Sequence, residues 1–154
     1  MIIYISRKNL KGQHSIYKIY SKLSRNIDKS LYLEVPFKSS FFGIIGNLFY
    51  IFLLRFRYKS VSIFHITGDI HYATLVLPRN KAVLTIHDLY GIRNNYGLKK
   101  LYFDFLWIYL PLISSENIFV PSYLIKRQLR YIHRINRINR KLKITVISHP
   151  LLYE

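Results

Sequence analysis

The segment VSIFHITGDIHYATLVLPRNKAVLTIHD, residues 61–88, decides the fold class of this chain. It opens on the apolar run 61–67 and closes on a second apolar run, 81–88, and both have the length and composition of buried β-strands. Between them, residues 70–77 predict a short helix that Pro78 closes. Two apolar strands joined by a helix are the unit from which parallel sheets are built.

The same alternation of strands and helices continues on both sides of this segment. Further strands are predicted at 2–6, 30–36, 117–122 and 142–148, and further helices from Ser15 onward and at 39–59, 97–113 and 122–135. The strands are nearly all apolar, as expected when both faces of a sheet are covered. We therefore expect an α/β fold: a Rossmann-like, mostly parallel sheet of about six strands with helices on both faces.

The helix boundaries carry their own signals. Ser15, Ser39 or Ser40, and Ser122 stand where a serine caps a helix N-terminus. The helix at 97–113 is expected to end near Pro111, because proline removes a hydrogen bond from a helix interior. Residues 1–150 form one predicted domain, and 151–154 read as the start of a linker.

Composition and charge narrow the function classes. The chain of 154 residues is 51% apolar, which predicts a folded domain, and it has no cysteine, which excludes disulfides and thiolate zinc sites. Its first residues show neither the basic region nor the cleavage site of a secretory signal, so we expect a cytoplasmic protein. The net charge of +17 favours polyanionic partners.

Polar residues gather where the predicted strands end. After strands one, three, four and five come, in turn, Lys11, Gly12, Gln13, His14 and Ser15; Thr67, Gly68, Asp69 and His71; His87 and Asp88; and Ser122. His65 lies inside the third strand. Since ligands bind beyond the carboxyl ends of the strands in an open parallel sheet, we expect one polar cleft along this edge.

Each candidate also has a structural interpretation. Gly12 either shapes a loop or lets the backbone approach a phosphate. Asp69 either caps the following helix or contacts a ligand. His65 is either a core histidine or a site residue, whereas a purely structural role is less favoured for His87. Asp88 either turns the chain or lines the cleft.

Other reaction classes have weaker support. Two histidines and an aspartate would suffice for zinc with an open position, but the helical H-x-x-x-H spacing is absent, so no metal is expected. Asp69 and Asp88 are the only carboxylate pair available for glycoside hydrolysis. Neither G-x-S-x-G nor G-x-G-x-x-G occurs, which disfavours a serine hydrolase and a dinucleotide site.

Six segments together resemble the N-terminal half of a family 4 retaining glycosyltransferase of the GT-B type, which has two Rossmann-like domains. They are KGQHSI (11–16), FHITGDIHY (64–72), VLTIHDL (83–89), GLKKLYFDFLWIYLPL (97–112), IFVPSYLIKRQL (118–129) and KITVISHP (143–150). The resemblance runs from Ile2 to Pro150. It implies that this half holds the acceptor and that a C-terminal domain holds the nucleotide-sugar.

The resemblance also implies roles for individual residues. His87 would lie beside the transferred sugar as the catalytic-side residue. The other implied positions are the donor-phosphate loop Gly12, Gln13 and His14; the acceptor contacts Thr67, Gly68, Asp69, His71 and Asp88; and the supporting residues Ser122 and Lys126. The chain departs from the family pattern in having one glycine in the first loop and Pro121 in the fifth strand.

The family's nucleotide-sugar site and its E-x7-E carboxylates belong to the second domain. We therefore expect that residues 1–154 bind no cofactor, that the nucleotide-sugar is a co-substrate of the complete enzyme, and that the chain alone transfers no sugar efficiently. It would be half of a split enzyme with a separate donor domain, a truncated product or a relic.

Two segments, one apolar with a basic end and one basic throughout, suggest binding partners. The apolar run 41–54 is too short to span a bilayer, which takes about 20 residues. It is either a helix packed on the sheet or, with Arg55, Arg57 and Lys59 behind it, an interfacial helix on the anionic inner face of a membrane, which suits a lipid-linked glycan acceptor. The eight Lys and Arg within 126–143 would suit a nucleic acid, but no nucleic-acid motif is present. A non-catalytic membrane- or nucleic-acid-binding module remains the alternative function.

Overall fold

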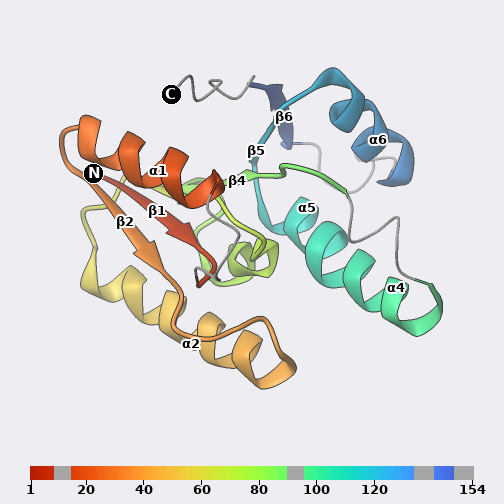
Figure 1. The fold of residues 1–154 in the computed structure, drawn as a ribbon, viewed down its shortest axis with the longest axis horizontal. Helices are drawn as coiled ribbons and strands as arrows, with labels where there is room; N and C mark the ends of the chain where they lie inside the picture. Colours follow the sequence, from red (N-terminus) through yellow and green to blue (C-terminus); the bar gives the residue numbers. More distant parts are fainter. Residues whose placement is uncertain (9–14, 90–95, 134–140, 148–154) are drawn as a thin grey trace.

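The computed structural model describes residues 1–8, 15–89, 96–133 and 141–147. Within these ranges six strands form one sheet, in which every pairing is parallel and the order is β2-β1-β3-β4-β5-β6 (Figure 1). The strands are β1 (Ile2–Ser6), β2 (Ser30–Glu34), β3 (Ile63–Ile66), β4 (Ala82–Thr85), β5 (Asn117–Val120) and β6 (Lys143–Val146). The predicted Rossmann-like α/β fold is confirmed.

Helices connect the strands as the alternating pattern predicted. They are α1 (Ser15–Asn26), α2 (Phe41–Arg57), the 3₁₀ helix η1 (His71–Val76), α4 (Gly97–Phe103), the π-helical segment η2 (Asp104–Tyr109), α5 (Leu110–Ser114) and α6 (Tyr123–His133). Two predicted serine caps are confirmed. The Ser40 hydroxyl accepts from the Gly43 amide at 3.2 Å, and the Ser122 hydroxyl accepts from the Ile125 amide at 3.3 Å.

The helices divide unequally between the two faces of the sheet. The chain steps from β1 to β2 in one direction and takes every later step in the other. Because parallel crossovers are right-handed, α1 covers one face and α2, η1, α4, η2, α5 and α6 cover the opposite face. Figure 1 shows α1 and α2 on opposite sides of β1 and β2. The direction of winding reverses between β1 and β3, which is the topological switch point of the sheet.

The two faces of the sheet differ in chemistry. The face toward α2 is apolar throughout, with Ile3, Ile5, Leu31, Leu33, Phe64, Ile66, Ala82, Leu84, Ile118, Val120, Ile144 and Val146. The α1 face is mixed. It carries the polar residues Ser6, Ser30, Glu34, His65, Thr85, Asn117, Lys143 and Thr145 beside Ile2, Tyr4, Tyr32, Ile63, Val83 and Phe119. Helices cover both faces as predicted, but they are unequally distributed between them. On the α1 face, α1 is the one described helix, and Lys143 and Thr145 of β6 are exposed.

A buried asparagine fastens the start of α2 to the loop before it. The Asn47 side chain accepts from the Phe37 amide and donates to the Phe37 carbonyl, each at 3.0 Å, and it also donates to the Tyr72 hydroxyl at 3.0 Å. A side chain at Gly43 would place its Cβ 1.9 Å from the Lys38 carbonyl oxygen, so only glycine allows this close approach. The backbone of Phe37 and Lys38 is thus held close to the start of the helix.

The helix predicted to end near Pro111 continues to Ser114, so that boundary is wrong. The helical hydrogen bonds change to a five-residue spacing before the proline, where the Leu110 amide donates to the Phe105 carbonyl. In an α-helix the residue at position 111 would donate to the carbonyl of Trp107, but proline has no N–H. The Trp107 carbonyl accepts a hydrogen bond from Nδ1 of His71 at 2.8 Å. A side chain from η1 thus bonds a backbone carbonyl of the helix in the turns just before Pro111.

Candidate functional site

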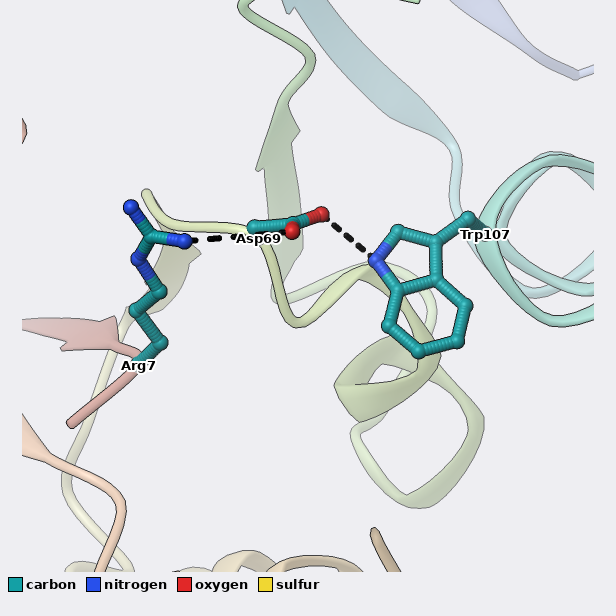
Figure 2. A network of polar contacts seen from close by, with 3 residues as sticks. All are labelled: Arg7, Asp69 and Trp107. Carbon is teal, nitrogen blue, oxygen red and sulfur yellow. Dashed lines mark hydrogen bonds and ion pairs between the residues drawn. The ribbon is translucent and has the colours of Figure 1, made fainter. Parts of the chain in front are cut away.

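The candidate site lies at the switch point, where β1 and β3 end side by side. Arg7 directly follows β1, and Asp69 stands three residues after the last residue of β3. Nη1 of Arg7 is 3.9 Å from Oδ2 of Asp69, so the ion pair bridges the two strand ends (Figure 2). Open parallel sheets bind ligands at such a point.

Asp69 is oriented by a tryptophan from the other side. The indole Nε1 of Trp107 donates to Oδ1 of Asp69 at 2.6 Å, so the carboxylate lies between Arg7 and Trp107 (Figure 2). The interpretation of Asp69 as a helix N-cap is wrong, because η1 begins at His71 and no side chain caps it. The Asp69 side chain is still 56% exposed, which leaves its carboxylate open to a ligand.

His71 is buried behind this carboxylate. Its Nδ1–H donates to the Trp107 carbonyl, which fixes the tautomer of the neutral ring. Burial lowers the pKa of His71, while the nearby Asp69 carboxylate and the Trp107 carbonyl act in the opposite direction. Trp107 is therefore held twice, through its indole by Asp69 and through its backbone by His71, and His71 serves to position it.

Thr67 and Gly68 join the ends of β1 and β3. Thr67 is fully buried, and its amide and hydroxyl both donate to the Ile5 carbonyl, at 2.9 and 3.3 Å. A Cβ at Gly68 would lie 2.8 Å from the Ser6 hydroxyl oxygen and 3.0 Å from the Arg7 amide nitrogen. These two predicted acceptor contacts therefore lie beneath the edge and bring Arg7 close to Asp69.

His87 extends the polar edge to the next strand. It follows β4 by two residues, it is half-buried, and its Nε2–H donates to the Thr67 carbonyl at 2.7 Å. Asp88 comes next and is exposed. The structure thus brings Asp69 and His87, predicted from two separate strands, to one edge.

His65 is a core histidine on the α1 face of the sheet. Its Nε2 shares a 2.7 Å hydrogen bond with the Thr85 hydroxyl, and its ring packs against Tyr4, Tyr20 and Phe119. Burial, with a smaller contribution from His87, lowers the pKa of His65 from 6.5 to about 4. The structure therefore supports the interpretation of His65 as a core histidine rather than a site residue.

The stability of the protein is expected to fall in mild acid because of His65. The unfolded chain binds a proton near pH 6.5 and the folded chain near pH 4, so the contribution is full above pH 6.5 and is lost as the pH falls toward 4. We expect a loss of about 2 kcal/mol across this window. Urea unfolding at pH 7 and at pH 4.5 measures it, and His65→Gln should flatten the dependence, leaving the part due to His71. An unchanged slope in His65→Gln would contradict the assignment.

The remaining predicted site residues are placed as follows. Ser122 caps α6, and its carbonyl accepts from the half-buried Lys126 amide at 3.2 Å, so both support the start of that helix. The donor-phosphate loop Gly12, Gln13 and His14 lies outside the described residues. Arg7 and Trp107 were missed as site residues. The signal for Arg7 was its place directly after the first strand.

Comparison with known proteins adds no relative. No family model, no curated protein and no solved structure matches the chain. Over the described ranges, no group of three or more His, Cys, Asp or Glu side chains is arranged to hold a metal ion. In those same ranges no helix combines the length and apolarity needed to cross a bilayer.

Proposed function

We propose that this chain is the acceptor-binding half of a GT-B-type glycosyltransferase, which transfers a sugar from a nucleotide-sugar to a glycan or lipid-linked acceptor. The observation that carries the proposal is the ion pair of Arg7 and Asp69 across the switch point, with His87 on the next strand. The sequence resemblance supplies the reaction class, and the sheet supplies a site where such chemistry is found in α/β folds.

The chemistry of this edge suits a saccharide. A carboxylate that is fixed on one side and exposed on the other accepts hydrogen bonds from sugar hydroxyls, and a guanidinium beside it donates to sugar oxygens. Asp69 and Arg7 offer this pair within 3.9 Å. Since Trp107 already restrains Asp69, binding a sugar there costs little side-chain entropy.

His87 has the role of a positioned polar group in this proposal. Its Nε2–H is engaged by the Thr67 carbonyl, which orients the imidazole at the carboxyl end of β4. The described sheet is one Rossmann-like unit, so the proposal assigns the nucleotide-sugar to a second domain. Sugar transfer by residues 1–154 alone would contradict that assignment.

Asp69→Asn is expected to weaken saccharide binding at least tenfold, because it removes a charge-assisted hydrogen bond worth roughly 1.5–3 kcal/mol. The measurement is amide NMR titration with a panel of neutral mono- and disaccharides, since neutral probes avoid non-specific attraction to the basic chain. Shifts are expected at Arg7, Asp69 and His87. Asp28→Asn is the matched control, because Asp28 is exposed in the turn before β2, at the opposite edge.

The outcome that would overturn the proposal is equally specific. It is the absence of saccharide-induced shifts at these residues, together with tight, salt-sensitive binding of a DNA or RNA duplex along α6 and β6. That result would favour the basic binding module instead.

A further inference from the structure

The α2 helix carries a second apolar face that the described residues leave uncovered. Its exposed large side chains follow helical spacing and are Phe41, Phe42, Ile45, Phe49, Phe52, Leu53 and Phe56, which we call the outer face of α2. Phe42 is 82% exposed and Phe49 is 64% exposed. Soluble proteins rarely expose a contiguous apolar stripe of this kind, and where they do it usually marks an interaction site.

The inner face of the same helix already supplies its packing. Ile44, Ile51 and Leu54 are buried against the sheet, and Asn47 fastens the preceding loop. The helix is therefore seated without any help from the outer face. An apolar outer face is not needed to hold α2 on the sheet, so its composition requires a different explanation.

The charges around the outer face identify its occupant. Lys38 stands before α2, while Arg57 and Lys59 stand at its end, and all three are exposed. No acidic residue occurs anywhere between Glu34 and Asp69. An apolar stripe between cations suits the boundary of an anionic bilayer, where aromatic rings enter the acyl region and cations contact headgroups. A second copy of a chain with a net charge of +17 would bring like charges together instead.

We propose that the outer face of α2 docks on an anionic lipid bilayer, with the helix lying in the plane of the interface. The helix begins just after the carboxyl end of β2, the same edge of the sheet at which Asp69 and His87 lie. Given the proposed function, this placement brings the acceptor site to the headgroup level, where a lipid-linked acceptor is presented.

The test is co-sedimentation with vesicles of phosphatidylglycerol and phosphatidylcholine, compared with vesicles of phosphatidylcholine alone. Wild-type protein should bind the anionic vesicles at least tenfold more tightly. The double variant Phe42→Ser/Phe49→Ser should lower that binding by roughly thirtyfold, since two aromatic side chains no longer leave water. Both positions are exposed, so the fold should persist, and circular dichroism checks this.

The matched control is Tyr123→Ser/Leu124→Ser on α6. These side chains are 77% and 61% exposed, close to the values for Phe42 and Phe49, but they lie on a different helix. The control should change vesicle binding by less than about twofold.

Variants that remove positive charges distinguish binding to anionic headgroups from non-specific hydrophobic adsorption. Arg57→Gln/Lys59→Gln should weaken binding to anionic vesicles by roughly tenfold and leave binding to phosphatidylcholine unchanged. Raising the salt from about 0.05 M to about 0.5 M should have the same direction of effect.

Two results would overturn the proposal. One is equal vesicle binding by wild type, Phe42→Ser/Phe49→Ser and the α6 control. The other is a wild-type dimer in solution that ignores vesicles and becomes monomeric in Phe42→Ser/Phe49→Ser, because a second copy would then cover the outer face. The vesicle and oligomer measurements use no sugar. A negative result for membrane docking is therefore distinct from a negative result for the proposed glycosyltransferase function.

Discussion

Trp107→Ala is expected to lower the free energy of unfolding by about 5 kcal/mol, at the upper end for truncation of a buried aromatic side chain. Trp107 is 5% exposed, and its ring packs against Tyr72, Tyr102 and Phe103. Truncation leaves a cavity between η1 and the η2 segment, and it also deletes the hydrogen bond to Asp69. The loss of packing and the loss of the hydrogen bond both lower the free energy of unfolding, so their costs add.

Trp107→Phe separates the two losses. It keeps most of the aromatic packing and removes only the indole N–H, so we expect a cost of about 1 kcal/mol from the hydrogen bond to the half-exposed Asp69, with a modest packing loss in addition. Chemical denaturation followed by circular dichroism compares the variants, because Trp107 is the only tryptophan and fluorescence is lost with it. Equal costs for Ala and Phe would show that packing contributes little and would contradict the prediction.

Asn47→Ala is expected to cost about 4 kcal/mol. The amide side chain makes three hydrogen bonds, and its removal leaves the fully buried Tyr72 hydroxyl and both backbone groups of Phe37 without this partner. Each lost bond costs about 1 kcal/mol, and the cavity left at the fully buried Asn47 adds to it.

Asn80→Ala is the control for that measurement. Asn80 is an exposed asparagine in the turn before β4, so its loss should change the free energy of unfolding by less than about 0.5 kcal/mol. Denaturant midpoints of the two variants give the comparison. A similar small shift for both would mean that the loop before α2 is not held by Asn47.

The fold was predictable because its signals are local. Each strand is an apolar run bounded by polar residues, and α1, α2 and α6 each have a serine cap or a basic end, so the order of elements follows from short windows. The polarity of the α1 face was not predictable in the same way. Tyr4, His65 and Phe119 look like members of apolar runs, and only the pairing register shows that they lie together on one face.

The helix through Pro111 shows a different limit. Proline normally ends a helix, and the local prediction followed that rule. The structure continues because the turn widens before Pro111 and the proline falls in the first turn of α5, where its missing N–H is tolerated. The Trp107 carbonyl in this region bonds to His71, a residue 36 positions earlier. No local window contains both residues. The polar role of Asn47 was missed for the same reason, since its partner Tyr72 lies 25 positions away.

The candidate site was predictable in position but not in detail. The rule for parallel sheets placed Asp69 and His87 at one edge, and the structure brings them there. It did not reveal that Thr67, Gly68 and His71 are buried beneath that edge. Arg7 and Trp107 required the geometry, because the first is one of many basic residues and the second lies in an apolar helix.

The shared attachment of Asp69 and His71 to Trp107 has a consequence for the order of folding. Both hydrogen bonds join the turn after β3 to a residue nearly forty positions later, so during synthesis they form only once the chain through Trp107 has been made and has docked. The turn after β3 therefore acquires its final shape late, when the helix from α4 to α5 docks. A nascent chain would hold a complete β1–β2–β3 sheet before it holds an oriented Asp69.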